Sequence, residues 1–155
     1  MMVEFVDPSS QAGADLLGAL DREIEALDLV VLRARTLMLI HATGSIEFAG
    51  RAAAELDQAS VLLDRCSRER SLALDGARTQ WDVNPATANE LVDAAPGEAG
   101  PLLSARFDRA RSLVDEYMAV NETIQRLVEK RSEAVQRQRS DLDRAQRGDV
   151  TYRAK

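Results

Sequence analysis

The residues best suited to catalysis or metal binding are few in this 155-residue sequence. His41 is the only histidine and Cys66 is the only cysteine. A zinc or haem site needs several nitrogen or sulfur ligands, and a nucleophilic cysteine needs a base beside it. We therefore interpret Cys66 as a small core residue and His41 as a structural or partly exposed one. The sequence predicts a protein that is not an enzyme and that uses no cofactor or metal.

Carboxylates are abundant, but their spacing does not match a catalytic or metal site. The pairs Asp21/Glu25 and Asp115/Glu116 fit solvated faces of helices. Di-iron helical bundles require a Glu-x-x-His motif twice, which one histidine cannot supply. The eight glycines are scattered rather than gathered into a phosphate-binding loop. One Trp, two Tyr and three Phe are too few to indicate a base-stacking surface.

The net charge of −6 argues against general nucleic-acid binding, because a basic surface supplies most of that affinity. The charge is unevenly distributed. Residues 130–155 contain eight Lys or Arg and four Asp or Glu, a net of +4, so residues 1–129 carry −10. The C-terminal segment is thus a basic extension on an acidic body. It fits two roles, a solvated helix end favoured by the helix dipole or a surface that docks a partner.

Cysteine usage and the absence of long apolar runs bear on the compartment. A single cysteine cannot form an internal disulfide, which is typical of a reducing compartment. The first seven residues are acidic where a signal peptide is basic, and no run approaches the ~18 apolar residues of a membrane span. We expect a cytoplasmic protein that is neither exported nor embedded in a membrane.

Three long segments place apolar residues at alternating spacings of three and four, which predicts helices packed side by side. The first begins after Asp7 and Pro8, which suit a helix start, and ends near Gly44, with Ser45 placed to cap the next helix. Its stripe is Leu17, Leu20, Ile24, Leu27, Val31, Ala34, Met38 and His41. The second stripe, rich in small residues, is Ala49, Ala52, Leu56, Ala59, Leu63, Cys66, Arg70, Ala73 and Ala77.

A connector and a third, longer stripe follow. Thr87 and Glu90 form a capping-box pattern for a short helix, and Trp81 is expected to plug the end of the bundle. The third stripe is Leu103, Phe107, Ala110, Val114, Tyr117, Asn121, Ile124, Val128, Arg131, Val135, Gln138, Leu142 and Ala145. It turns polar at Arg131 and Gln138, and Gly148 is expected to end the helix.

These elements predict an all-α fold. We expect an antiparallel bundle of three long helices plus a short connector helix, in which the last helix is the longest and overhangs the others. The overhang follows from length, since at 1.5 Å per residue the first two helices reach roughly 50 Å and the last roughly 70 Å. Residues 1–148 form one helical domain in this prediction. Residues 149–155 form a flexible tail.

The order of these features resembles the FlgN family of flagellar type III export chaperones, which bind hook–filament junction proteins before secretion. The resemblance spans most of residues 12–147. It depends on the turn Thr43-Gly44-Ser45, the connector TANELVDAAP at 87–96, and the stretch MAVNE at 118–122 in the last helix. Family members often carry a second asparagine three residues after the first, where this chain has Ile124.

In the family, the C-terminal part of the last helix and the tail hold the export substrate, which corresponds here to residues 124–152. The resemblance and the surplus apolar stripe together imply a client that binds as a helix along this segment, with arginines meeting acidic groups of the client or of the export apparatus. The candidate partner-binding residues are Asn121, Ile124, Val128, Val135, Arg139, Leu142, Val150 and Tyr152.

Two other functions remain open from the sequence. The last helices of two subunits could pair through the same stripe as a self-assembling coiled coil, with Asn121 fixing the register. A helical sensor or adaptor with a small-molecule pocket is the other, although seam positions that are mostly Ala and Leu leave few polar groups to orient a ligand. We expect a monomer or weak dimer that binds protein and no nucleic acid.

Overall fold

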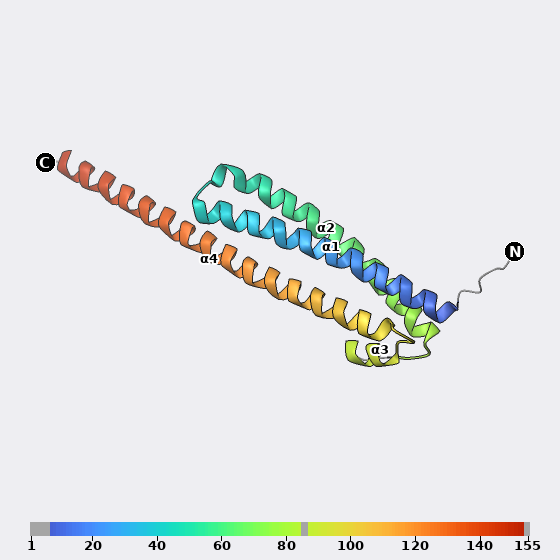
Figure 1. Cartoon of the computed structure of the whole chain (residues 1–155). Helices are drawn as coiled ribbons and strands as arrows, with labels where there is room; N and C mark the ends of the chain where they lie inside the picture. Colours follow the sequence, from blue (N-terminus) through green and yellow to red (C-terminus); the bar gives the residue numbers. More distant parts are fainter. Residues whose placement is uncertain (1–6, 85–86, 154–155) are drawn as a thin grey trace.

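The computed structural model describes residues 7–84 and 87–153, with side chains in the last helix described as far as Gly148. The elements are α1 (Pro8–Thr43), the 3-10 turn η1 (Ile46–Phe48), α2 (Ala49–Gln80), α3 (Ala88–Ala94) and α4 (Ala99–Arg153). No strand occurs in these residues. The fold is the predicted all-α bundle of three long helices with a short connector, and α4 is the longest and extends past its neighbours (Figure 1).

Local capping interactions explain where α1 begins and ends. The Asp7 side chain accepts a hydrogen bond from the Ser9 backbone amide at 3.3 Å, and Pro8 occupies the first turn. At the other end Gly44 adopts a left-handed conformation with φ of 76°, and its amide donates to the Ile40 carbonyl. Both expectations from the sequence are confirmed.

The predicted cap at Ser45 is wrong. The Ser45 side chain caps no helix, and its hydroxyl instead lies 3.3 Å from that of Thr43. The chain inserts the 3-10 turn of η1 before α2 begins at Ala49. The chain therefore reverses direction through an additional 3-10 turn between α1 and α2, where the sequence predicted a single capping residue.

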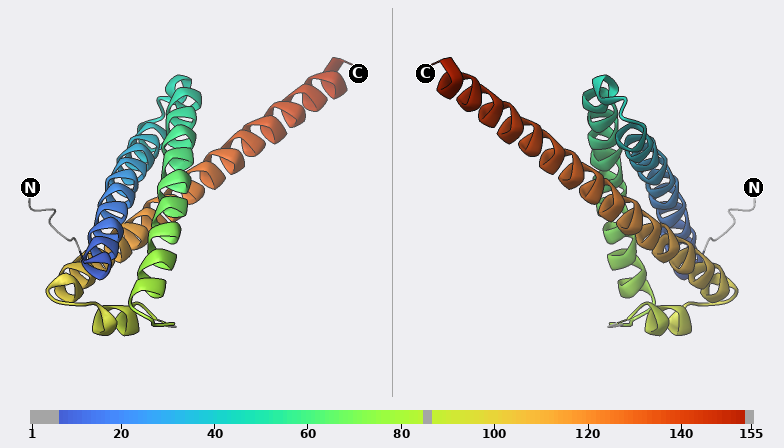
Figure 2. Two further views of the ribbon diagram at one scale, coloured as in Figure 1. Left: turned by 90° about the vertical axis from the view of Figure 1, so that its right-hand side faces the viewer. Right: turned by 90° about the vertical axis from the view of Figure 1, so that its left-hand side faces the viewer.

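Helix α1 is the central element of the bundle. It runs antiparallel to α2 and parallel to α4, and packs against both along its length (Figure 1). α4 crosses the α1–α2 pair obliquely and diverges from it towards the C-terminus (Figure 2). Because α1 lies against two helices, it buries a wider face than one stripe. Its buried residues outside the predicted stripe are Ala12, Gly13, Leu16, Ala19, Glu23, Ala26, Val30 and Leu37.

The core is a row of three clusters along α1. The first, at the connector end, joins all four α-helices and includes Leu16, Leu20 and Leu103. The second in space, around Leu27 and Leu113, lies at mid-bundle. The third joins the other ends of α1 and α2 to α4 and contains Ala34, Leu37, Ala52, Val120 and Ile124.

Small side chains let α2 approach α1 closely. The buried residues of α2 are Ala52, Ala59, Cys66 and Ala77, as the second stripe predicts. One charged group is buried in this interface. Glu23 of α1 is 9% exposed and accepts hydrogen bonds from Arg70 Nε at 2.7 Å and from the Ser67 hydroxyl at 3.0 Å.

The connector is held by the capping box and by Trp81. The Thr87 hydroxyl accepts from the Glu90 amide and the Glu90 carboxylate accepts from the Thr87 amide, each at 3.2 Å. The Trp81 indole packs on the first cluster and donates to the Ser9 carbonyl at 3.1 Å. A Cβ on Gly100 would lie 2.8 Å from the Val92 carbonyl oxygen, so only glycine lets α3 and α4 meet here.

Candidate partner-binding surface

The buried face of α4 is offset by one residue from the predicted stripe at alternate positions from Leu113 onward, whereas the stripe residues Leu103, Tyr117 and Ile124 pack in the core as predicted. Leu113 is 1% exposed, whereas Val114 is 41% exposed. Val120 and Leu127 are likewise turned further inward than Asn121 and Val128. The sequence carries apolar neighbours at 113/114 and 127/128, so spacing alone did not decide which of each pair faces α1.

Packing on α4 ends at Arg131, which is partly buried. A Cβ on Gly44 would lie 4.0 Å from Arg131 Nη2, so this residue is level with the turn that follows α1. Every side chain from Ser132 to Gly148 is exposed, including Val135 at 54% and Leu142 at 64%. We call residues 132–153 the overhang. At 1.5 Å per residue it extends about 33 Å past the bundle.

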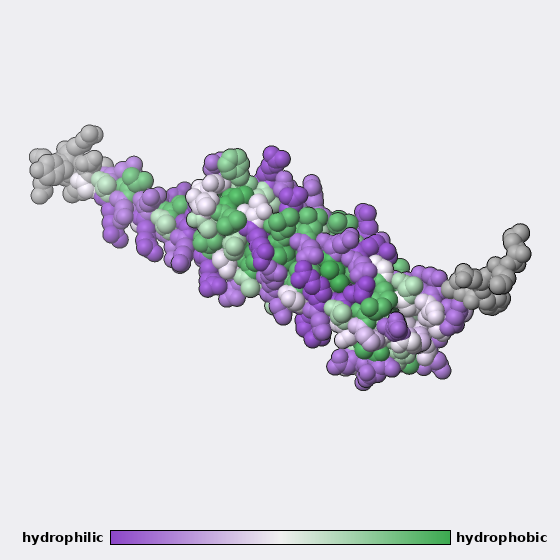
Figure 3. Space-filling view, viewed as in Figure 1, coloured by the Kyte–Doolittle hydropathy of each residue, from purple (hydrophilic) through white to green (hydrophobic). Residues whose placement is uncertain are grey.

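The apolar residues of the overhang lie on the same face of α4 that packs against α1 in residues 99–131. Val135 follows Tyr117, and Leu142 follows Ile124, by 18 residues each, which is about five helical turns. Tyr117 and Ile124 both pack on α1. The exposed stripe of Val135 and Leu142 therefore continues the packing face of α4 beyond the end of α1. Figure 3 shows apolar surface at separate places along an otherwise hydrophilic overhang.

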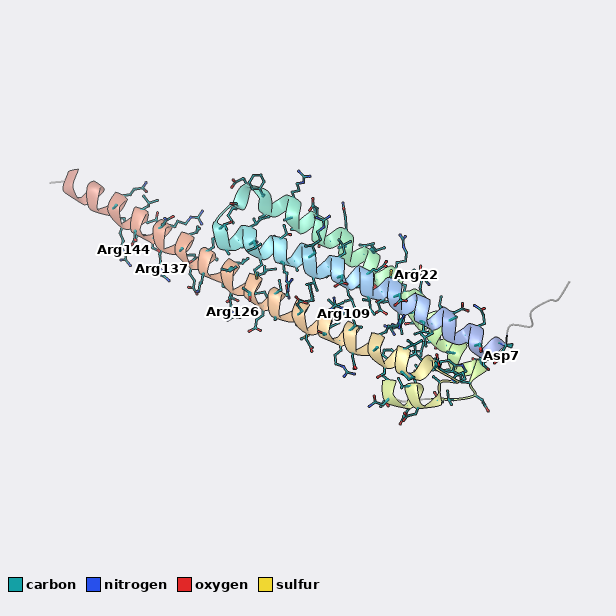
Figure 4. All side chains as sticks on the ribbon, viewed as in Figure 1. Asp7, Arg22, Arg109, Arg126, Arg137 and Arg144 are labelled. Carbon is teal, nitrogen blue, oxygen red and sulfur yellow. The ribbon has the colours of Figure 1, made fainter. Side chains whose placement is uncertain are left out.

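Arginines lie on two different sides of the C-terminal half of α4. Arg139 lies between Val135 and Leu142, four residues after the first and three before the second, so it borders their stripe. Arg126, Arg137 and Arg144 project along the side of α4 away from α1 (Figure 4). There Arg137 pairs with Glu133 at 3.6 Å.

Not all the predicted binding residues share this exposed surface. Ile124 is 8% exposed and packs with Leu37 and Ala52, so it belongs to the core of the chain and is not accessible to a partner. Asn121 is partly buried, and Val128 is 44% exposed at the bundle edge. Val135, Arg139 and Leu142 lie together on the overhang.

The last two predicted residues, Val150 and Tyr152, lie in the helical backbone of α4, and their side chains are outside the described part of the chain. The expectation that Gly148 ends the helix is wrong, since α4 continues to Arg153. Gly148 is not in a left-handed conformation. A single glycine inside a helix costs only about 1 kcal/mol and ends it only when the chain turns there.

Sequence reasoning missed an exposed apolar surface at the α1–α2 turn. Ile46 and Phe48, both in η1, are 36% and 56% exposed, and Leu39 near the end of α1 is 58% exposed. We call the two η1 residues, Ile46 and Phe48, the tip surface. The sequence contained a signal for this surface. Two apolar residues, Ile46 and Phe48, follow the glycine turn in a segment too short to form a helical stripe that could bury them.

The only histidine and the only cysteine of the sequence both lie in the bundle, with His41 partly buried near the end of α1. Cys66 is buried, and burial, followed by the negative charge of Glu69, raises the pKa of its thiol. Among the described residues, no three His, Cys, Asp or Glu side chains gather as metal ligands. Within the same residues, no helix combines the length and apolar character needed to cross a membrane.

The overhang and the tip surface are two exposed surfaces that carry large apolar residues; single exposed apolar residues such as Leu72 and Met118 also lie elsewhere on the bundle. Comparison of the chain with protein-family models, with curated proteins and with solved structures finds no match.

Proposed function

We propose that this protein is a cytoplasmic export chaperone of the FlgN kind, which binds flagellar hook–filament junction proteins before type III secretion. The overhang is the client-binding element in this proposal. The observation that carries it is the exposure of Val135 and Leu142 on the helix face that packs on α1 elsewhere. The sequence resemblance supplies the class of client.

The energetics fit a transient chaperone complex. Burying a large aliphatic side chain contributes about 1.5–3 kcal/mol. α4 offers three exposed ones, Val128 at the edge of the bundle and Val135 and Leu142 on the overhang. Ordering a flexible client segment costs about 2–5 kcal/mol. The surplus is at most about 7 kcal/mol, which corresponds at best to a dissociation constant of about 10 μM, so these residues support a weak complex that an export system can take apart. Arginines on the overhang would raise the association rate with an acidic client or export component.

The experiment is a pull-down and calorimetric titration with hook–filament junction proteins from the same organism. Deleting residues 132–155 removes the overhang and leaves the three core clusters intact, so we expect loss of binding with a folded bundle. Leu72→Asp on α2 is the control, because Leu72 is 72% exposed on the bundle. A truncated chain that still binds the client as tightly as the full chain would overturn the proposal.

Self-assembly is the second candidate. It is favoured by Val128, Val135 and Leu142 recurring every seven residues, as in one half of a coiled-coil seam. The other half is polar at Arg131 and Gln138, which weakens pairing between identical helices. Light scattering over a concentration series separates the candidates. A dimer that dissociates on Val135→Asp supports assembly, whereas a monomer at all concentrations supports the chaperone.

A further inference from the structure

The overhang by itself offers a narrow apolar surface, because between Ser132 and Gly148 only Val135 and Leu142 are large aliphatic residues. A protein interface normally buries about 800 Å² on each partner, with a few large anchoring side chains at its centre. Two aliphatic residues separated by two turns of helix do not make such a centre. A partner that binds here needs further apolar contacts close to the start of the overhang.

The tip surface lies in that position. Arg131 reaches the Gly44 turn, and Ile46 follows that turn directly, its amide donating to the Gly44 carbonyl at 2.9 Å. Val135 stands one helical turn beyond Arg131 on the same side of α4. The side of the overhang that carries the stripe thus begins beside the turn that presents Ile46 and Phe48.

Charge around the stripe indicates the chemistry of the partner. At about 100° per residue, Arg131 and Arg139 lie within about 50° of the stripe centre, and Gln138 also borders it. The acids Glu133, Asp141 and Asp143 lie about 90° or more away around the helix. The tip adds one exposed acid, Glu47. The stripe is therefore flanked by two arginines and one amide, Gln138, and a second copy of the chain would oppose the same arginines to one another.

We propose that the tip surface and the stripe side of the overhang form one docking surface for an amphipathic helix of another protein whose apolar face is flanked by acidic residues. The proposal rests on the proposed function in taking the overhang as a protein-binding element. Ile46 and Phe48 anchor one end of the bound helix, Val135 and Leu142 contact its middle and far end, and Arg131 and Arg139 meet its carboxylates.

The test uses the full chain and two synthetic peptides of three heptads, about 21 residues, which as helices match the overhang in length. Both carry leucines at the first and fourth heptad positions, flanked by glutamates in one peptide and by lysines in the other. Fluorescence anisotropy measures binding at low and high salt. We expect the glutamate peptide to bind at least tenfold more tightly than the lysine peptide, with an affinity that falls as salt rises.

Matched variants locate the binding surface. Ile46→Ser with Phe48→Ser is expected to weaken binding of the glutamate peptide about tenfold, and Val61→Ser, at an α2 residue that is 65% exposed, less than twofold. Arg139→Glu is expected to weaken binding about tenfold, and Arg144→Glu, on the opposite side of the overhang, less than twofold. Circular dichroism melts verify that each variant folds, as its exposed position predicts.

The outcomes separate this inference from the proposed function. If the tip variants bind the glutamate peptide as the parent does, or the lysine peptide binds equally well, or neither peptide binds, the joint surface is refuted. If junction proteins need the overhang but tolerate the tip substitutions, the chaperone proposal stands and the joint surface falls. If the peptide pattern holds and junction proteins do not bind, the surface stands and its client belongs to another class.

Discussion

Helix α4 consists of two regions that differ in what surrounds them. Residues 99–131 bury Leu103, Leu113, Val120 and Ile124 against α1, whereas the described side chains of residues 132–148 are all exposed. The backbone is continuous helix across the boundary. The packed region draws its stability from burial of an apolar face. The overhang depends on helix propensity and on pairs such as Glu133–Arg137, which contribute only tenths of a kcal/mol.

The largest expected effect comes from truncating one leucine in each region. Leu113→Ala is expected to lower the free energy of unfolding by about 2–5 kcal/mol, because the side chain is fully buried in the middle cluster. Leu142→Ala removes the same atoms from an exposed site and is expected to change it by less than about 0.5 kcal/mol. Urea denaturation measures both. Equal losses would mean that the overhang packs within the monomer.

Removing one glutamate from the α1–α2 interface and one from the overhang extends the contrast between packed and exposed regions to polar groups. Glu23→Ala leaves Arg70 and Ser67 without their partner inside the α1–α2 interface, and we expect a loss of about 1–3 kcal/mol. Glu133→Ala breaks an exposed ion pair between residues one helical turn apart and is expected to lower the free energy of unfolding by about 0.2–0.5 kcal/mol. Denaturant midpoints at constant salt are the measurement. A cost at Glu23 no larger than at Glu133 would show that its buried pair contributes nothing to stability.

Replacing each of two glycines in α4 by alanine is expected to change stability in opposite directions. Gly100→Ala would place a Cβ against the Val92 carbonyl, and overpacking of this kind costs about 1–3 kcal/mol. Nothing lies within 4 Å of a Cβ on Gly148, and alanine there should favour the helical end by up to about 1 kcal/mol. Far-ultraviolet circular dichroism should show greater helicity for Gly148→Ala with an unchanged melting midpoint. A lowered midpoint would place Gly148 in a folded contact.

Thiol reactivity gives the finest comparison. Burial keeps the Cys66 pKa raised, so this thiol should react slowly with Ellman's reagent, while a cysteine introduced by Ser140→Cys on the overhang should react at the rate of a free thiol. Since the folded pKa of Cys66 exceeds the unfolded one, its contribution to stability is complete below the unfolded pKa. It is lost as pH rises through the folded pKa. Equal labelling rates at neutral pH would contradict the buried placement.

Local sequence determined the ends of several helices and the lengths of α1 and α2 to within a few residues, whereas α4 has 55 residues and is longer than the roughly 70 Å expected. The cap at Asp7, the left-handed Gly44 and the Thr87–Glu90 capping box all involve groups at most four residues apart, so nearby residue types suffice to predict them. The overhang was also predictable from the sequence, because the length of a helix is proportional to its number of residues and the last helix has more residues than the other two.

Only the tertiary structure decided which apolar residues face inward. Leu113 and Val114 are equally good core residues by type, and the oblique crossing of α4 over α1 selects the first. The Glu23–Arg70 pair joins residues 47 positions apart, and the exposure of Phe48 depends on how the turn stands relative to both helices. Spacing along one helix sets the period of its apolar face, but the direction of that face is set by neighbours distant in the chain.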